Sequence, residues 1–115
     1  MLFTSGDRIV FTGDSVTDAG RGRPVGEGLW QGVGDGYVRT IDNILNVVYP
    51  DWRLWVSNTG TGGDTSRSLK KRWQEDVMNL KPDWVSLMIG INDIWRQFDT
   101  PTIPEQHVYP AEYRE

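Results

Sequence analysis

Several residue types and patterns are missing from this chain, and each absence excludes a class of protein. The 115 residues include no cysteine, which rules out a disulfide framework and thiolate metal sites. No apolar run approaches the roughly 18 residues of a membrane helix. The first residues lack the basic start and long apolar core of a secretion signal. We therefore expect a cytoplasmic protein with no membrane partner.

Positive charge is also in short supply. Lysine and arginine number 12 against 16 acidic residues, which gives a net charge of −4 and argues against a nucleic-acid partner. The charges are mixed along the chain, as on a solvated surface. With 37% hydrophobic residues the chain is expected to form one modest domain, and it contains no internal repeat or linker.

The most informative stretch runs from Arg8 to Arg21 and reads RIVFTGDSVTDAGR. An apolar run ends abruptly at Gly13, which predicts a buried strand over residues 8–13 followed by a tight bend. The bend carries Ser15 to the carboxyl end of the strand, where open α/β sheets bind their ligands. A serine there is a candidate nucleophile, although GDS is also an ordinary turn sequence.

Two further strand ends carry polar residues. Residues 57–66 (SNTGTGGDTS) follow a second predicted strand, and a glycine-rich loop of this kind can point backbone N–H groups at negative charge. Residues 84–93 (WVSLMIGIND) read as a third strand that ends in glycine and asparagine. A serine, a glycine loop and an asparagine on three successive strand ends match the needs of acyl transfer, in which an attacked carbonyl oxygen becomes negative.

The three blocks resemble the first signature blocks of the SGNH (GDSL-type) hydrolases. They are residues 13–15 (GDS), 58–65 (NTGTGGDT) and 90–93 (GIND). Residues 13–24 and 81–86 are similar, within that family, to the intracellular acetylxylan esterases, which remove O-acetyl groups from xylo-oligosaccharides. The resemblance implies a three-layer, flavodoxin-like α/β fold with a parallel sheet and helices on both faces, incomplete in this chain.

The resemblance also implies roles for three residues. Ser15 would be the nucleophile, and its backbone N–H, that of Gly63 and the side-chain amide of Asn92 would hold the oxyanion. Gly63 is chosen among the loop glycines because it directly precedes the Asp-Thr pair. No metal and no other cofactor is implied, and the expected partner is a small acetylated saccharide. Homo-oligomer formation stays open.

One part of the family pattern is missing. The fourth block, a D-x-x-H segment that supplies the acid and the general base, occurs nowhere in the chain. The single histidine, His107, has Pro104 three residues before it, and we expect it on a connecting loop or helix start rather than in catalysis. The chain is therefore expected to be the amino-terminal portion of one hydrolase domain, inactive without its carboxyl-terminal complement because serine needs a base.

The order of elements follows from the hydrophobic pattern. Helices are predicted over residues 36–48 and 64–79, the second capped by Asp64 or Thr65, with strands at 53–57 and 84–89. Alternation of strand and helix predicts right-handed crossovers and a parallel sheet of order 2-1-3. A further helix is predicted to begin at Pro110.

Residues that bind the substrate are expected near the turn that carries Ser15. Candidate substrate-binding residues are Asp14, Arg21, Trp30 and Trp95. Trp30 lies in the glycine-rich loop 20–36 and could stack on a sugar ring, whereas a flexible surface loop is the plain alternative. Asp14 is expected to orient its loop by hydrogen bonds, and Trp73 and Trp84 are expected in the core.

Two other classes of function remain open at this stage. A nucleotide-binding module would use the glycine loop for phosphates, but residues 60–65 lack both the third glycine of a dinucleotide fingerprint and the GK[ST] of a P-loop. A non-catalytic carbohydrate-binding module on a hydrolase-like scaffold fits the missing base. The G-x-S-x-G elbow of other serine hydrolases is excluded by Thr17.

Overall fold

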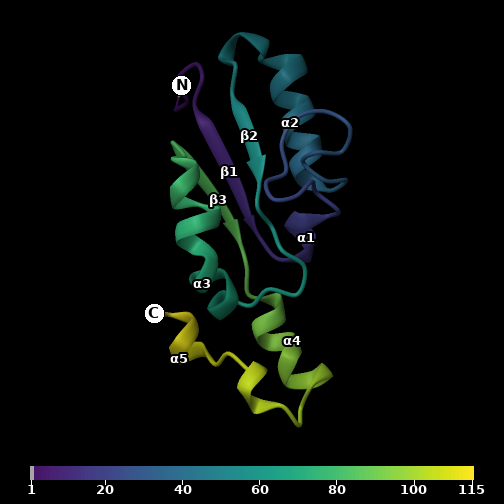
Figure 1. Cartoon of the computed structure of the whole chain (residues 1–115), viewed down its shortest axis with the longest axis vertical. Helices are drawn as coiled ribbons and strands as arrows, with labels where there is room; N and C mark the ends of the chain where they lie inside the picture. The colour runs from purple at the N-terminus through teal and green to yellow at the C-terminus, as the bar shows by residue number, and fades with distance from the viewer. Residues whose placement is uncertain (1) are drawn as a thin grey trace.

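Three parallel strands form the centre of the molecule. The computed structural model describes residues 2–115, in which β1 (Arg8–Gly13) lies between β2 (Trp55–Asn58) and β3 (Trp84–Met88), as Figure 1 shows. The predicted order 2-1-3 is confirmed. The bounds of β1 are as predicted, β3 ends one residue earlier, and β2 begins two residues later and ends one residue later.

Helices alternate with the strands along the chain. Because both crossovers are right-handed and β1 is central, α2 and α3 lie on opposite faces of the sheet (Figure 1). The helical elements are α1 (Ser15–Asp18), α2 (Tyr37–Val48), η1 (Pro50–Trp52), α3 (Ser66–Asp76), η2 (Met78–Leu80), α4 (Ile91–Asp99), η3 (Pro104–Gln106) and α5 (Pro110–Tyr113).

The main core lies between the sheet and α2. Ile9 and Phe11 point to this face and pack with Val33, Val38 and Val56, all of them buried. Alternation along β1 turns Val10, which is fully buried, to the face that α3 covers. The central strand is therefore covered on both faces, as the continuous apolar run of its sequence predicts.

The predicted helices form with small changes at their ends. α2 begins one residue later than predicted. At the start of α3 the cap is Thr65, whose hydroxyl accepts a hydrogen bond from the N–H of Ser68 while the Ser68 hydroxyl bonds the N–H of Thr65. α3 ends at Asp76 and a separate 3-10 turn follows it, so the single predicted helix over residues 64–79 is wrong in that part. α5 begins at Pro110, as predicted.

Two helices lie where the sequence analysis predicted none. α1 is one turn long and follows β1 directly. α4 carries Ile91, Ile94, Trp95 and Phe98 at three- and four-residue spacing, which is an amphipathic pattern that could have predicted it. Both helices lie at the carboxyl ends of the strands (Figure 1).

Much apolar surface on β3 and α4 is exposed. Trp84 was expected in the core but is 37% exposed, because β3 is an edge strand and its residues have no neighbour on one side within residues 2–115. The large hydrophobic side chains of α4 are more than half exposed. Trp73 on α3 is half-buried. None of the helices described here combines the length and the apolar character needed to cross a membrane.

Candidate active site

Ser15 begins a helix at the end of the central strand. Gly13 closes β1 with φ of 156°, and a Cβ at this position would lie 2.1 Å from the Met88 carbonyl oxygen, so the bend requires glycine. Asp14 caps α1 by accepting a hydrogen bond from the Val16 N–H at 3.0 Å. Ser15 is the first residue of α1 and its side chain is exposed. Its backbone N–H therefore lacks an acceptor within the helix.

The glycine loop lies against this turn. The Thr61 N–H donates to the Gly13 carbonyl oxygen at 3.0 Å, and the Gly62 N–H donates to Asp18 Oδ2 at 2.9 Å. A Cβ built on Gly62 would lie 3.9 Å from the Ser15 Cβ. Gly63 follows with φ of 81°, a left-handed conformation that favours glycine. The second sequence block thus lies beside the candidate nucleophile.

The third block is tied to the same loop. Asn92 is the second residue of α4, is buried, and donates from Nδ2 to the Asp64 carbonyl oxygen at 2.8 Å. The carboxylate of its neighbour Asp93 accepts hydrogen bonds from the N–H and the hydroxyl of Ser66. The structure therefore brings the three sequence blocks together at one end of the sheet.

Buried charge surrounds the loops. Burial by itself raises the pKa of Asp18, but hydrogen bonds from Arg23 and the Gly62 N–H, together with the charges of Arg23 and Arg21, outweigh it and leave the pKa below its usual value. Burial and the charge of Arg23 lower the pKa of Arg21, against the opposing effect of Asp18. Asp18 is thus held in its charged form where it contacts the glycine loop.

Comparison with known proteins gives a family match over most of the chain. A family model described as the GDSL-like Lipase/Acylhydrolase family matches residues 11–115. The chain belongs to this family.

Named relatives of this GDSL-like chain include an acetylxylan esterase. The Geobacillus stearothermophilus protein of that name is 53% identical over 113 residues, which is 98% of this chain and 52% of the relative. The chain therefore spans about half the length of the curated relative that it matches. A crystal structure of that enzyme, called Axe2, superposes with a TM-score of 0.95 at 53% identity and with the same coverage.

Other solved structures extend the comparison. LAE5, an alpha/beta hydrolase enzyme from the metagenome of Lake Arreo in Spain, is 50% identical with a TM-score of 0.92, over 96% of this chain and 51% of that one. A catalytic mutant of Axe2, S15A, matches with 52% identity and a TM-score of 0.95 over 98% of this chain and 52% of that one. The three strands and their helices are thus a part of an α/β SGNH hydrolase fold, as predicted.

The four predicted substrate-binding residues of this GDSL-like chain differ in how exposed they are to solvent. Asp14 is 2% exposed and Arg21 is 7% exposed. The Arg21 guanidinium donates to the carbonyl oxygens of Gly60 at 2.6 Å and of Gly22 and Pro24, so it supports the loops. Trp30 is 94% exposed in its loop, and Trp95 on α4 is 54% exposed. The substrate role of all four residues stays a prediction.

His107 lies on a connecting segment, as predicted. It follows η3, is buried, and its ring nitrogens contact the Thr100 carbonyl oxygen at 3.0 Å and the Tyr109 hydroxyl at 3.3 Å. Both nitrogens are therefore engaged by its own segment of the chain.

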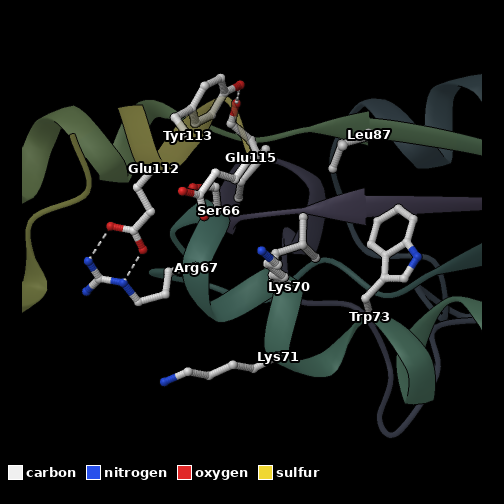
Figure 2. A pocket seen from close by; sticks show the side chains of 11 residues that line it. Ser66, Arg67, Lys70, Lys71, Trp73, Leu87, Glu112, Tyr113 and Glu115 are labelled. Carbon is white, nitrogen blue, oxygen red and sulfur yellow. Dashed lines mark hydrogen bonds and ion pairs between the residues drawn. The ribbon is translucent and has the colours of Figure 1, made fainter. Parts of the chain in front are cut away.

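Two surface pockets lie near these elements. The smaller, of about 390 Å³, adjoins Gly63 and is lined also by Thr65, Arg67, Ser68, Arg96 and Gln106. The larger, of about 670 Å³, lies between α3, β3 and α5 and includes none of Ser15, Gly63 and Asn92. Figure 2 shows this larger pocket, with the ion pair of Arg67 and Glu112 joining α3 to α5. The smaller pocket is the one that adjoins a candidate oxyanion donor.

The sequence analysis missed one residue that contacts two of these loops directly. Arg72 on α3 bonds the ends of β1 and β2 and the glycine loop. The spacing could have predicted this inward position, because Arg72 follows the buried Leu69 by three residues and therefore lies on the same face of the helix.

Proposed function

We propose that this chain carries the nucleophile and the oxyanion hole of a serine esterase that removes O-acetyl groups from xylo-oligosaccharides. The observation that carries the proposal is the meeting of Ser15, the glycine loop and Asn92 at one end of the sheet, joined by hydrogen bonds. Membership of an acylhydrolase family supports the reaction class. The name of the Geobacillus relative supports the acetylated substrate.

In the proposed reaction the Ser15 Oγ attacks the acetyl carbonyl carbon. Its proton passes to a general base, and the bond between the carbonyl carbon and the sugar oxygen then breaks as the departing sugar oxygen takes up that proton and becomes a hydroxyl. Water attacks the acetyl-serine, which releases acetate and restores Ser15. Both steps pass through a tetrahedral intermediate with a negatively charged oxygen.

Three donors would hold that oxygen. The N–H of Ser15 is free of the helix, and Gly63 can expose its N–H because a positive φ is open to glycine. The Asn92 amide has two N–H bonds, and the one on Asp64 fixes the orientation while the other stays available. Each donor would stabilise the transition state by about 3 kcal/mol.

The general base would come from a carboxyl-terminal complement. The chain contains no D-x-x-H segment, and it spans about half of its relative. Solved catalytic mutants of the Geobacillus enzyme include changes of an aspartate and a histidine whose residue numbers exceed the length of this chain. We infer that the complement also covers the exposed apolar residues of β3 and α4, namely Trp84, Val85, Leu87, Met88, Ile91, Ile94, Trp95 and Phe98.

The test uses this chain alone and a hybrid, in which the chain is followed by the part of the Geobacillus enzyme that it does not span. The hybrid should release acetate from acetylated xylo-oligosaccharides and take up one phosphonate adduct at Ser15, and the chain alone should do neither. Ser5→Ala, at an exposed serine away from the loops, should label like the unchanged hybrid. A hybrid that folds but is neither labelled nor active would overturn the proposal in favour of a non-catalytic module.

A further inference from the structure

One arginine side chain joins two of the three loops of the candidate site, the turn after β1 and the glycine loop. The Arg72 Nε donates to Asp64 Oδ2 at 2.6 Å, Nη1 donates to the Thr59 carbonyl oxygen at 2.7 Å, and Nη2 donates to the Gly13 carbonyl oxygen at 3.0 Å. Nη1 also contacts Asp76 at 3.0 Å, one turn later on α3. The side chain is only 16% exposed. The guanidinium is thus held in one orientation by acceptors on every side.

Three of the four acceptors belong to segments that would take part in the reaction. Gly13 precedes Ser15 by two residues at the end of β1, and Thr59 begins the glycine loop directly after β2. Asp64 follows Gly63, and its carbonyl oxygen accepts the hydrogen bond that orients Asn92. A shift of the Arg72 side chain would therefore displace Ser15 and the two other proposed oxyanion donors, Gly63 and Asn92.

Few side chains could make this set of contacts. A guanidinium presents five N–H donors in a rigid plane, whereas a lysine ammonium is a point charge with three donors on a flexible stem. Without Arg72 the carbonyl oxygens of Gly13 and Thr59 would lose a charged donor in a buried place. The two loops would then shift to find other hydrogen-bond donors. An oxyanion hole tolerates little displacement, because its N–H groups stabilise the transition state only when they already point at the oxygen that becomes charged.

We propose that Arg72 is a positioning residue for the oxyanion hole. It touches neither the substrate nor the reacting atoms. It fixes the segments that bear Ser15 and Gly63 directly, and it acts on Asn92 through Asp64, whose carbonyl oxygen accepts the Asn92 hydrogen bond. This inference rests on the proposed esterase function.

The first test compares two lysine variants in the hybrid. Arg72→Lys should lower kcat about 100-fold and leave KM within about threefold, because a displacement of about 1 Å misaligns transition-state contacts without removing substrate contacts. The matched control is Arg39→Lys on α2, whose guanidinium bonds the Asp35 carboxylate at 2.9 Å in an exposed ion pair. The control should keep kcat within about twofold.

A second readout does not depend on activity. Amide hydrogen exchange at Thr61 and Gly62, whose N–H groups donate to the Gly13 carbonyl oxygen and to Asp18, should be about tenfold faster in Arg72→Lys than in the unchanged hybrid, with no such change in Arg39→Lys. If the hybrid without any substitution lacks esterase activity, the proposed function is overturned. The amide exchange rates would still decide whether Arg72 fixes the loops. An active hybrid whose Arg72→Lys variant keeps its kcat would overturn only the role of Arg72.

A third variant covers the case in which Arg72→Lys does not fold. Asp64→Asn keeps the shape of the side chain and removes one charged acceptor of Arg72, so kcat should fall about tenfold at nearly constant KM. An unchanged kcat in this variant would overturn the proposal. A parallel rise in KM would also count against it, since it would indicate lost substrate binding rather than lost alignment.

Discussion

The carboxylate of Asp18 accepts a hydrogen bond from the backbone N–H of Gly62 at 2.9 Å. Asp18 ends the helix that Ser15 begins, and Gly62 belongs to the glycine loop beside it. The same carboxylate oxygen accepts a hydrogen bond from Arg23 at 2.7 Å. The relative position of the nucleophile and the glycine loop therefore depends on a charged, largely buried side chain.

This contact predicts a loss of stability in acid. The pKa of Asp18 is lower in the folded protein than its ordinary value of 3.8, so the folded state favours the charged form. The stabilisation is complete above the unfolded pKa and is lost as the pH falls through the lower folded pKa. The difference in Tm between the hybrid and its Asp18→Asn variant should be large at pH 6 and should shrink below about pH 4. A difference independent of pH would show that the charge of Asp18 contributes nothing.

Ser15 and Asn92 should have separable effects on catalysis. Ser15→Ala removes the nucleophile and should bring turnover by the hybrid to background. Asn92→Ala removes one oxyanion donor and should lower kcat by about 100- to 1000-fold with little change in KM, because the donor acts mainly on the transition state. Steady-state kinetics on one acetyl ester would measure both. Turnover retained in the serine variant would refute the nucleophile assignment.

Gly60 is a position that cannot accept a side chain. A Cβ there would lie 2.5 Å from the Asp18 backbone nitrogen, so Gly60→Ala should destabilise the hybrid by about 3 kcal/mol, which lowers Tm by roughly 6–12 °C. Gly22→Ala is the matched control, since its nearest contact would be an ordinary 3.5 Å and its effect should stay below about 0.5 kcal/mol. Equal thermal shifts in the two variants would contradict the close approach of the loop to α1.

Trp30 should affect sugar binding and not stability. Its side chain is 94% exposed, so Trp30→Ala should leave Tm unchanged. Loss of a stacking contact of about 1 kcal/mol should raise KM for an acetylated xylo-oligosaccharide several-fold and leave a small aryl acetate unaffected. Leu29→Ala, at an equally open neighbouring position, is the control.

The exposed apolar residues of β3 and α4 predict the behaviour of the 115-residue chain by itself. It should be unstable or should associate at micromolar concentration, because an edge strand and an apolar helix face are open to other molecules. Phe98→Ser, at a side chain that is 71% exposed, should reduce the association, and the hybrid should remain dispersed. Sedimentation and thermal unfolding would measure this. A monomeric chain with one cooperative unfolding transition would contradict the prediction.

The sequence predicted the strands and the order of the sheet because these follow from local signals. The buried run before Gly13 and the breaks at Pro50 and Pro82 mark the elements, and right-handed crossovers then leave few arrangements. α4 was missed although its apolar spacing was visible. Trp84 was misjudged because an apolar strand residue is read as buried, whereas an edge strand without a neighbour leaves it open.

The sequence by itself determined which residue types stand at the ends of the three strands, and hence the choice of Ser15, Gly63 and Asn92. Tertiary structure alone decided how these ends are held together. Arg72 and Arg21 look like ordinary helix and loop charges. Arg21 is buried and Arg72 is largely buried, and both donate to carbonyl oxygens of distant segments. The physical reason is that hydropathy and turn signals act over a few residues. The acceptors of a buried guanidinium are fixed only when folded strands bring segments dozens of residues apart to one place.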